Sequence, residues 1–369
     1  MIRRLYVDNY RCFVNFELRL DDLTLLLGPN GVGKTSVLDV MFALRQLLSG
    51  QARVIDRTVL PWQSLTRWQQ RDMQVIDLDV VLEGEQMRYR LEVEHERDSR
   101  RARIALERLD VSSGPLFLFR MGEVQLYRDN HSEGPTFSAD WSESALARVP
   151  PRQDNTKLTR FLEFVRKLVI CGLYPAGFDS EAAEADPVLE RNGRNFPAWY
   201  QHLVLDRPDP DLIMALREVI DGFHKIRMPA VGLDTRAVLI QFDHGDGGQP
   251  YELRLDEISD GQRALIALYT LIRLAPEQGY TLLLDEPDNY VALAEIQPWL
   301  MELADAAGER VAQAVVCSHH PELIDYLGAE RGILLERARS GPVTTRPLAE
   351  AAAGEGLSLS EQVARGWQR

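Results

Sequence analysis

The chain is poor in cysteine and has no long hydrophobic run. Three cysteines, Cys12, Cys171 and Cys317, occur in 369 residues. They lie far apart and form no CxxC pair, so they predict neither a disulfide framework nor a zinc site. No segment approaches the roughly 18–20 apolar residues that cross a bilayer, and the first residues lack the apolar core of a signal peptide. We therefore expect a soluble protein in a reducing, cytoplasmic compartment.

Basic residues are outnumbered by acidic residues. The formal net charge is −14 at pH 7, from 42 Lys and Arg against 56 Asp and Glu. This excess of negative charge disfavours general binding of polyanions such as nucleic acid. One local basic run remains, formed by Arg97, Arg100, Arg101 and Arg103, and runs of this kind are usually solvated. The length is sufficient for one large domain with an insertion, or for two lobes.

Strand–loop–helix patterns occupy the two ends of the chain. The apolar run at 23–27 predicts a buried strand, and an amphipathic helix follows it. The same pattern returns after residue 260. Alternating residues over 75–128 predict a β-meander with a hairpin around Gly84-Glu85. Between the ends we further predict helices over 158–174 and 210–226, loops over 129–156 and 176–210, and a hairpin turn at Asp246-Gly247-Gly248.

The clearest motif is the stretch GPNGVGKTS at residues 28–36, which fits G-x-x-x-x-G-K-[ST]. Glycine lets the backbone curl so that N–H groups point at phosphate oxygens, and the following helix start favours an anion. We expect Lys34 to reach the β- and γ-phosphates and Thr35 to bind Mg²⁺. The predicted nucleotide contacts of this loop are Asn30, Gly31, Val32, Gly33, Lys34, Thr35 and Ser36.

Two later strands end in side chains that suit hydrolysis. Asp285 and Glu286 follow the buried run LLL, and ligands bind outside the carboxyl ends of strands in open α/β sheets. We expect Asp285 to hold Mg²⁺ and Glu286 to polarise the attacking water. After the next strand, His319 rather than His320 is expected to contact the γ-phosphate or that water.

A second glycine-containing loop precedes an apolar helix at residues 259–262. By itself, Ser259 there is an ordinary helix N-cap. Its position ahead of LLLDEPD favours a second interpretation, in which the loop Ser259, Asp260, Gly261 and Gln262 contacts a nucleotide.

These motifs together resemble the ABC-type ATPases of the SMC/RecF/OLD group. The resemblance rests on GPNGVGKTS, ISDGQRALIAL, LLLDEPD and CSHHPELID, supported by the opening IRRLYVDNYRCFVNFELRL and by VLERNGRNFPAWYQHL. It implies an α/β fold, namely an ABC-type P-loop ATPase head with a mixed β/α core sheet, an antiparallel β subdomain and an inserted helical lobe. It also implies ATP and Mg²⁺ as cofactors, with the loop at 259–262 closing on the nucleotide of a second copy of the chain.

The resemblance further implies a glutamine lid that senses Mg²⁺. Gln63, Gln69, Gln70 and Gln74 all lie in the expected interval. We take Gln63 and Gln74 as the candidates, with Gln74 as the predicted metal ligand. A surface glutamine is the competing interpretation of each.

The motifs divide the chain into four predicted segments. Residues 1–128 form an N-terminal ATPase half, 129–235 an inserted loop and helical lobe, 236–340 a C-terminal ATPase half, and 341–369 a tail. The phosphate loop and the signature loop are about 225 residues apart, which argues against a transporter subunit. The histidine–proline pair that many relatives carry after DEPD is absent, so the protomer-contact loop Asp288–Leu293 is unusual.

Three functions remain open. The first is an ATP-driven switch that closes as a homodimer and controls a partner effector, such as a nuclease-like protein, in bacterial anti-phage defence. Because few residues follow GILLER, we expect this chain to act without an OLD-type nuclease domain of its own. The second is a RecF-like repair ATPase that binds DNA in the closed dimer, which the net charge disfavours. The third is a scaffold without turnover, against which Glu286 and His319 argue.

Overall fold

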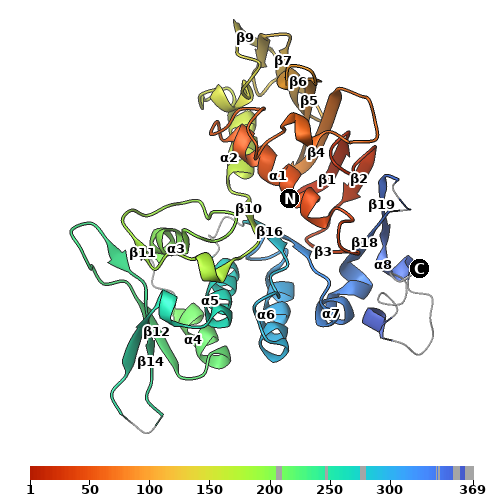
Figure 1. Cartoon of the computed structure of the whole chain (residues 1–369). Coiled ribbons are helices and arrows are strands. Elements are labelled where there is room, and N and C mark those ends of the chain that lie inside the picture. Colours follow the sequence, from red (N-terminus) through yellow and green to blue (C-terminus); the bar gives the residue numbers. More distant parts are fainter. Residues whose placement is uncertain are drawn as a thin grey trace. The chain divides into compact units, whose positions relative to one another are not determined.

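The computed structural model describes residues 1–204, 210–245, 248–274, 280–337, 339, 341–351 and 358–361. The chain divides into two compact units: unit 1 comprises Met1–Leu168 with Leu327–Arg369, and unit 2 comprises Val169–Tyr326 (Figure 1). Each unit combines strands and helices, so the predicted α/β class is confirmed. No helix in the described ranges has the length and apolarity that crossing a membrane requires. The four predicted segments were drawn from sequence motifs, whereas the two units are defined by contacts. The four-segment division therefore stays a prediction.

Unit 1 contains an eight-stranded antiparallel sheet. Its strands, in spatial order, are β2 (Phe16–Arg19), β1 (Ile2–Asp8), β4 (Met73–Leu82), β5 (Glu85–Glu96), β6 (Arg101–Val111), β7 (Gly114–Arg120), β8 (Glu123–Tyr127) and β9 (Glu133–Ser138). The predicted meander and its first hairpin are therefore confirmed. The hairpin turns at Glu83-Gly84, where both residues have positive φ, as two-residue turns between antiparallel strands favour.

The inner face of this sheet is apolar and faces helix α2 (Thr156–Arg166). Tyr89 of β5 stacks on Phe161 of α2 with ring centroids 5.5 Å apart. The Tyr89 hydroxyl donates to the fully buried carboxylate of Glu107 at 2.9 Å, and Ser144 donates to the same carboxylate. Burial raises the pKa of Glu107. Because this face is closed by packing, Glu107 is a buried exception on it. The opposite face carries a row of charged side chains formed by Arg4, Asp79, Arg88 and Asp110.

The phosphate-loop strand belongs to a second group of strands in unit 1. β3 (Leu23–Leu27) is buried along its whole length and pairs in parallel with β18 (Gly332–Arg337), which pairs antiparallel with β19 (Val343–Pro347). Helix α1 (Lys34–Leu48) follows β3 through the glycine-rich loop. The continuous apolar run thus forms the buried parallel strand that the sequence predicted.

Unit 2 contains the other strand–helix pairs. Three parallel strands, β10 (Val169–Cys171), β16 (Thr281–Asp285) and β17 (Gln313–Cys317), lie side by side. The helices are α3 (Phe196–Val204), α4 (Pro210–Val219), α5 (Asp260–Arg273) and α6 (Leu293–Ala306), while α7 (Pro321–Arg331) contains the chain crossing into unit 1. The smaller strands are β11 (Glu181–Ala182), β12 (Phe223–Arg227), β13 (Arg236–Ala237), β14 (Leu239–Phe242) and β15 (Tyr251–Arg254).

Two predicted helices are too long. The helix expected over 158–174 ends at Arg166, and β10 follows because the short run Val169–Cys171 is completely buried beside β16. An apolar run of this length does not distinguish a helix from a buried strand. The helix expected over 210–226 ends at Val219, and Gly222, with φ 70°, turns the chain into β12.

The predicted loops also contain regular structure. The 129–156 segment includes β9, whose side chains are mostly exposed and so carry no apolar signal, and the 176–210 segment includes α3. β14 and β15 pair antiparallel, as the hairpin prediction requires. The predicted turn residues Asp246 and Gly247 lie outside the described residues.

Candidate nucleotide-binding and hydrolysis site

The phosphate loop has the backbone that its glycines predict. Gly28, Gly31 and Gly33 have φ values of 146°, 78° and 119°. A Cβ on Gly28 would lie 2.6 Å from the carbonyl oxygen of Leu335, and one on Gly33 would lie 2.8 Å from the sulfur of Cys12. Side chains at Gly28 and Gly33 are therefore excluded by both backbone conformation and space.

Lys34 lies across this loop. Its side chain is buried, and its ammonium donates to the Gly28 carbonyl at 2.7 Å. Asn30, Gly31 and Thr35 are exposed, whereas Val32 and Ser36 are buried. The loop thus presents a held cation at the start of α1, an arrangement suited to phosphate oxygens.

Two neighbours of the loop were not predicted as site residues. The guanidinium of Arg11 forms an ion pair with Asp39 of α1 and lies 3.5 Å from the Ser36 hydroxyl. The thiol of Cys12 lies 3.7 Å from the Val32 carbonyl, and burial raises its pKa. Both residues follow β1, some 20 residues before the loop, so spacing along the chain gives no signal for them.

Gln74 lies in β4, where it is 1% exposed. Its amide nitrogen donates to the Asn9 carbonyl at 2.9 Å and the Ser64 hydroxyl at 3.0 Å. Its oxygen lies 2.8 Å from Nε2 of His95 and 3.5 Å from Ser64. Both amide hydrogens are therefore used, and the amide oxygen accepts from His95, while the Ser64 hydroxyl donates its own hydrogen to the Pro61 carbonyl at 2.6 Å. The structure therefore gives Gln74 a packing role within the sheet and does not present it as a metal ligand.

Of the two candidates, Gln63 is the exposed one, and Gln70 in the same interval is exposed as well. Gln63 lies in the short 3₁₀ helix η1 (Trp62–Ser64). Since an amide that acts as a lid must reach solvent, Gln63 is the stronger candidate for the predicted glutamine lid.

The buried His95 predicts a pH dependence of stability. Burial and the nearby Arg97 lower its pKa from 6.5 to about 4. Because the unfolded chain then binds the proton more readily, the contribution of neutral His95 is complete above pH 6.5 and is lost as the pH falls toward 4. We expect this residue to remove about 3 kcal/mol from the free energy of unfolding between pH 7 and pH 4. Urea unfolding of the wild type and of His95→Gln checks this.

The matched control is His202→Gln, which changes an exposed histidine of α3. His95→Gln should flatten the pH profile, and His202→Gln should retain it. An unchanged profile in His95→Gln would show that other groups carry the dependence.

The carboxyl ends of β16 and β17 bring two predicted catalytic residues together. Asp285 pairs with Cys317 in the last register position, and the Glu286 N–H donates to the Cys317 carbonyl at 2.8 Å. A Glu286 carboxylate oxygen lies 3.3 Å from Nδ1 of His319. Both side chains are partly exposed, at 30% for Glu286 and 49% for His319.

Glu286 has a constrained backbone and a further partner. Its φ is 48°, which is rare for a residue with a side chain. Asn289 donates to its second carboxylate oxygen at 2.9 Å. Strained residues persist where their surroundings hold them, often at functional sites. Asn289 lies three residues beyond Glu286 in the sequence, yet the motif did not predict it.

The loops after β16 and β17 are joined beneath this pair. The buried Ser318 hydroxyl donates to Asp288 at 2.8 Å and accepts from the His320 N–H at 2.9 Å. Asp288, the first residue of the predicted protomer-contact loop, thus fixes the segment that carries His319. Of the two adjacent histidines, His319 makes the described contact with Glu286.

The signature loop begins α5 as a capping box. The Ser259 hydroxyl accepts from the Gln262 N–H at 3.2 Å, while the Gln262 side-chain oxygen accepts from the Ser259 N–H at 3.1 Å. Asp260 and Gly261 are the first two helical residues. A Cβ on Gly261 would lie 3.0 Å from the Tyr290 carbonyl oxygen, so glycine permits this loop to pack closely on the loop after β16.

Arg263 anchors the signature loop and was not predicted. Its guanidinium donates to the carbonyl oxygens of Asp256, Ile258 and Pro175 at 2.8, 2.9 and 3.1 Å. Its side chain is 11% exposed. The sequence shows an arginine directly after SDGQ, which was the available signal for this residue. Its partner Pro175 lies in a distant segment of the chain, so the sequence alone did not reveal the anchoring contacts.

The predicted site residues therefore fall into two groups, one in each unit. Unit 1 holds the residues of the phosphate loop, and unit 2 holds Glu286, His319, Asp285 and the signature loop. A sequence model of the family described as "AAA domain, putative AbiEii toxin, Type IV TA system" matches residues 23–325, which include both groups. The chain belongs to this AAA family.

Solved structures identify the fold of the AAA-family chain. An Smc head domain of Pyrococcus furiosus, crystallised with an extended coiled coil and bound to the C-terminal domain of ScpA, aligns over 100% of this chain and 99% of its own. The TM-score is 0.55 at 9% identity. An SMC head domain of Thermotoga maritima aligns over 94% and 98%, with a TM-score of 0.48 at 13% identity. The P. furiosus match confirms the predicted ABC-type P-loop head as a fold.

A sequence relative supports the same group. The OLD nuclease of Thermus scotoductus (strain ATCC 700910 / SA-01) is 50% identical over 38 residues, which are 10% of this chain and 7% of that protein. This chain therefore matches only a small part of that relative's length. Together with the family match, these similarities place the AAA-family chain among the SMC/RecF/OLD-like ABC-type ATPases.

Proposed function

We propose that this chain binds and hydrolyses ATP with Mg²⁺, closes as an ATP-sandwiched dimer, and thereby controls a partner effector. The observation that carries the proposal is the Glu286–His319 pair at the carboxyl ends of β16 and β17. A carboxylate held between an imidazole and the Asn289 amide is suited to orient a water molecule for phosphoryl transfer.

The residues of the phosphate loop fit a nucleotide triphosphate. The close approach of backbone at Gly28 and Gly33 leaves N–H groups rather than side chains at the loop surface, and Lys34 adds a buried cation. Residues 30–36 would hold the phosphates, and Lys34 would stabilise the charge that develops on them. Bound MgATP would supply the scissile phosphoric anhydride.

Thr35 and Asp285 are the residues that would hold Mg²⁺. In the described parts of the chain, no group of three or more His, Cys, Asp or Glu side chains could hold a metal. Mg²⁺ in nucleotide sites is usually bound by one or two protein oxygens together with phosphates and water. The donor set of this chain fits that pattern.

The signature loop supports dimer closure. Ser259, the helix start of α5 and the exposed loop edge form a second anion-directed surface in addition to the phosphate loop. The P. furiosus head domain is described as bound to part of another protein, ScpA, and the family description names a putative AbiEii toxin of a type IV TA system. These descriptions support an effector partner for this chain, and we place that pair in bacterial anti-phage defence.

Phosphate release from MgATP by the purified chain tests the proposal. Turnover that requires Mg²⁺, rises faster than linearly with protein concentration and disappears in Lys34→Ala would support an ATPase that works as a dimer. Binding of MgATP without turnover, at protein concentrations where the chain is dimeric, would contradict it.

One observation favours a second candidate function, DNA binding by the closed dimer. The guanidiniums of Arg67 and Arg100 both lie 5.4 Å from the ring centroid of Trp62. In the described residues neither guanidinium has a carboxylate partner, whereas Arg97 and Arg103 pair with acids. Unpaired arginines beside an indole are typical of surfaces that bind single strands.

Fluorescence anisotropy with a labelled single-stranded oligothymidylate tests this candidate. If DNA binds there, the double variant Arg67→Gln, Arg100→Gln should weaken binding about tenfold or more. It should also reduce the slope of the salt dependence by about 1.4 units, since each phosphate contact on a single strand contributes about 0.7. The control Arg103→Gln removes a paired arginine and should change little. Equal binding by all three proteins would remove this candidate.

A further inference from the structure

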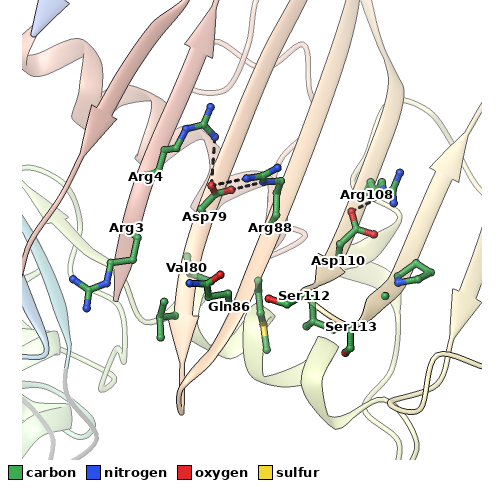
Figure 2. Close-up of a pocket in the computed structure, with 15 residues that line it drawn as sticks. Arg3, Arg4, Asp79, Val80, Gln86, Arg88, Arg108, Asp110, Ser112 and Ser113 are labelled. Carbon is green, nitrogen blue, oxygen red and sulfur yellow. Dashed lines mark hydrogen bonds and ion pairs between the residues drawn. The ribbon is translucent and has the colours of Figure 1, made fainter.

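A charged pocket of about 560 Å³ lies on the outer face of the eight-stranded sheet in unit 1, away from the phosphate loop in sequence (Figure 2). It is lined by residues of β1, β4, β5 and β6, by the β6–β7 turn and by the first residues of β7. The turn contributes Ser112 and Ser113. Neither the proposed hydrolysis nor the dimer closure uses any of these residues.

A row of alternating charges crosses four strands at the floor of the pocket. Arg4, Asp79, Arg88 and Asp110 are successive cross-strand partners. Arg88 binds Asp79 through two hydrogen bonds of 2.8 and 3.1 Å, and Arg4 reaches the same carboxylate at 3.4 Å. Cross-strand partners point to one face, so the whole row borders the pocket, as Figure 2 shows.

A bulge adds one more arginine to this row. The register of β1 against β4 moves from Ile2↔Val80 to Arg4↔Asp79, so Arg3 is the extra residue. This explains how the consecutive residues Arg3 and Arg4 both line the pocket. Within the described part of the chain, the Arg3 guanidinium has no hydrogen bond and no carboxylate partner.

The opposite end of the row has an unused acceptor. Arg108 binds one oxygen of Asp110 at 2.6 Å. The other oxygen, Oδ1, is buried and has no hydrogen-bond partner. A buried acceptor without a partner costs free energy unless a donor reaches it. Four arginines and two aspartates line the pocket; Arg4 is also paired with Glu17, so the positive charge without a carboxylate partner in the described part of the chain is that of Arg3.

Arg3 and Asp110 define what the pocket can recognise. They lie on β1 and β6, three strand spacings apart, which is about 14 Å at the usual spacing of strands. A ligand that satisfies both must be elongated, with an anionic group at one end and an N–H donor at the other. A nucleotide has these two groups in its phosphate and in the amino group of its base.

We propose that this pocket is a second nucleotide site, in which Arg3 binds the phosphate and Asp110 accepts from the base. Ser113 lies at the rim with its hydroxyl 2.6 Å from Nε2 of His131, whose Nδ1 donates to the Pro115 carbonyl at 3.2 Å. This tautomer makes Nε2 the acceptor, so the Ser113 proton is held by the histidine. Its oxygen lone pairs remain for a donor on the ligand.

AMP is the probe that tests the site, because it lacks the β- and γ-phosphates that Lys34 is expected to contact. Isothermal titration calorimetry of the Lys34→Ala chain should show one AMP bound per chain. Arg3→Gln in that background should weaken AMP binding at least about tenfold, since it removes a charge-assisted hydrogen bond. Asp110→Ala should weaken AMP but leave the affinity for ribose 5-phosphate unchanged, because the sugar phosphate has no base.

The matched control is Arg19→Gln, which removes an exposed arginine of neighbouring β2 that pairs with Glu17 outside the pocket. It should leave AMP binding unchanged. Absence of AMP binding at millimolar concentration, or equal binding by Arg3→Gln and Arg19→Gln, would overturn the proposal. Selective binding of an extended acidic peptide in place of AMP would also overturn it and would identify a protein-docking groove.

Discussion

Glu286→Gln is expected to lower ATP turnover by at least about 100-fold while ATP binding is retained. Glutamine keeps the shape of the side chain and can still contact Asn289, but it cannot polarise a water molecule as a carboxylate does. Because hydrolysis would no longer reopen the sandwich, the variant should accumulate as a dimer with MgATP. Phosphate release measures the first effect, and light scattering with size-exclusion chromatography measures the second.

Glu309→Gln provides the control for this variant. Glu309 is an exposed carboxylate of unit 2 outside the site, so its replacement should leave both turnover and mass unchanged. Wild-type turnover in Glu286→Gln would assign the water-orienting role to another residue. A variant that binds MgATP, has lost turnover and remains monomeric would retain the catalytic role of Glu286 and exclude the sandwich.

The second large effect is expected from mixing two inactive proteins. Ser259→Arg places a bulky cation in the signature loop but leaves the phosphate loop intact, whereas Lys34→Ala does the opposite. Each homodimer then lacks one half of both composite sites. In a mixed dimer, the phosphate loop of the Ser259→Arg chain meets the signature loop of the Lys34→Ala chain, so one complete site forms. An equimolar mixture should therefore recover about a quarter of the wild-type rate, since half of the dimers are mixed and each has one site of two.

This experiment separates a contact across the dimer from one within the chain. If Ser259 acted on the nucleotide of its own chain, no mixture would contain a complete site and no activity would return. ATP binding by Ser259→Arg alone, measured by equilibrium dialysis, should be close to wild type. Thermal unfolding of both variants controls for loss of fold, because Ser259 is also the N-cap of α5.

Local motifs predicted the fold class, and they placed the candidate site residues in loops that follow buried strands, because the order of strand, loop and helix can be recognised from the spacing of residues along the chain. The phosphate loop is the clearest example: strand, glycines, lysine and helix are contiguous, and β3 and α1 follow as predicted. The Glu286–His319 pair was accessible for a related reason. Each residue follows a buried strand, and parallel neighbouring strands bring their carboxyl ends to one edge.

Contacts between distant segments were not accessible in this way. Arg263 holds a carbonyl of Pro175, and Ser318 holds Asp288, and neither pairing leaves a periodic signal. The burial of Gln74 could not be predicted either. Its position along the chain suits the glutamine lid, but the residue lies in strand β4, where it is buried. The run Val169–Cys171 could have continued helix α2 by its apolar pattern alone. It forms strand β10 instead, because parallel pairing with β16 buries it.

The capping box at the start of α5 has a consequence for reversibility. The Ser259 hydroxyl is already engaged, since it accepts from the Gln262 N–H at 3.2 Å and lies 3.2 Å from the Gln262 side-chain oxygen. A phosphate that takes the Ser259 proton must displace that side-chain contact, so the exchange yields a smaller net gain than a new bond would. In the proposed closed dimer, the first turn of the helix would compete with the incoming nucleotide for one hydroxyl. This competition would reduce the free energy gained on closure, so that hydrolysis of one ATP would suffice to reverse it.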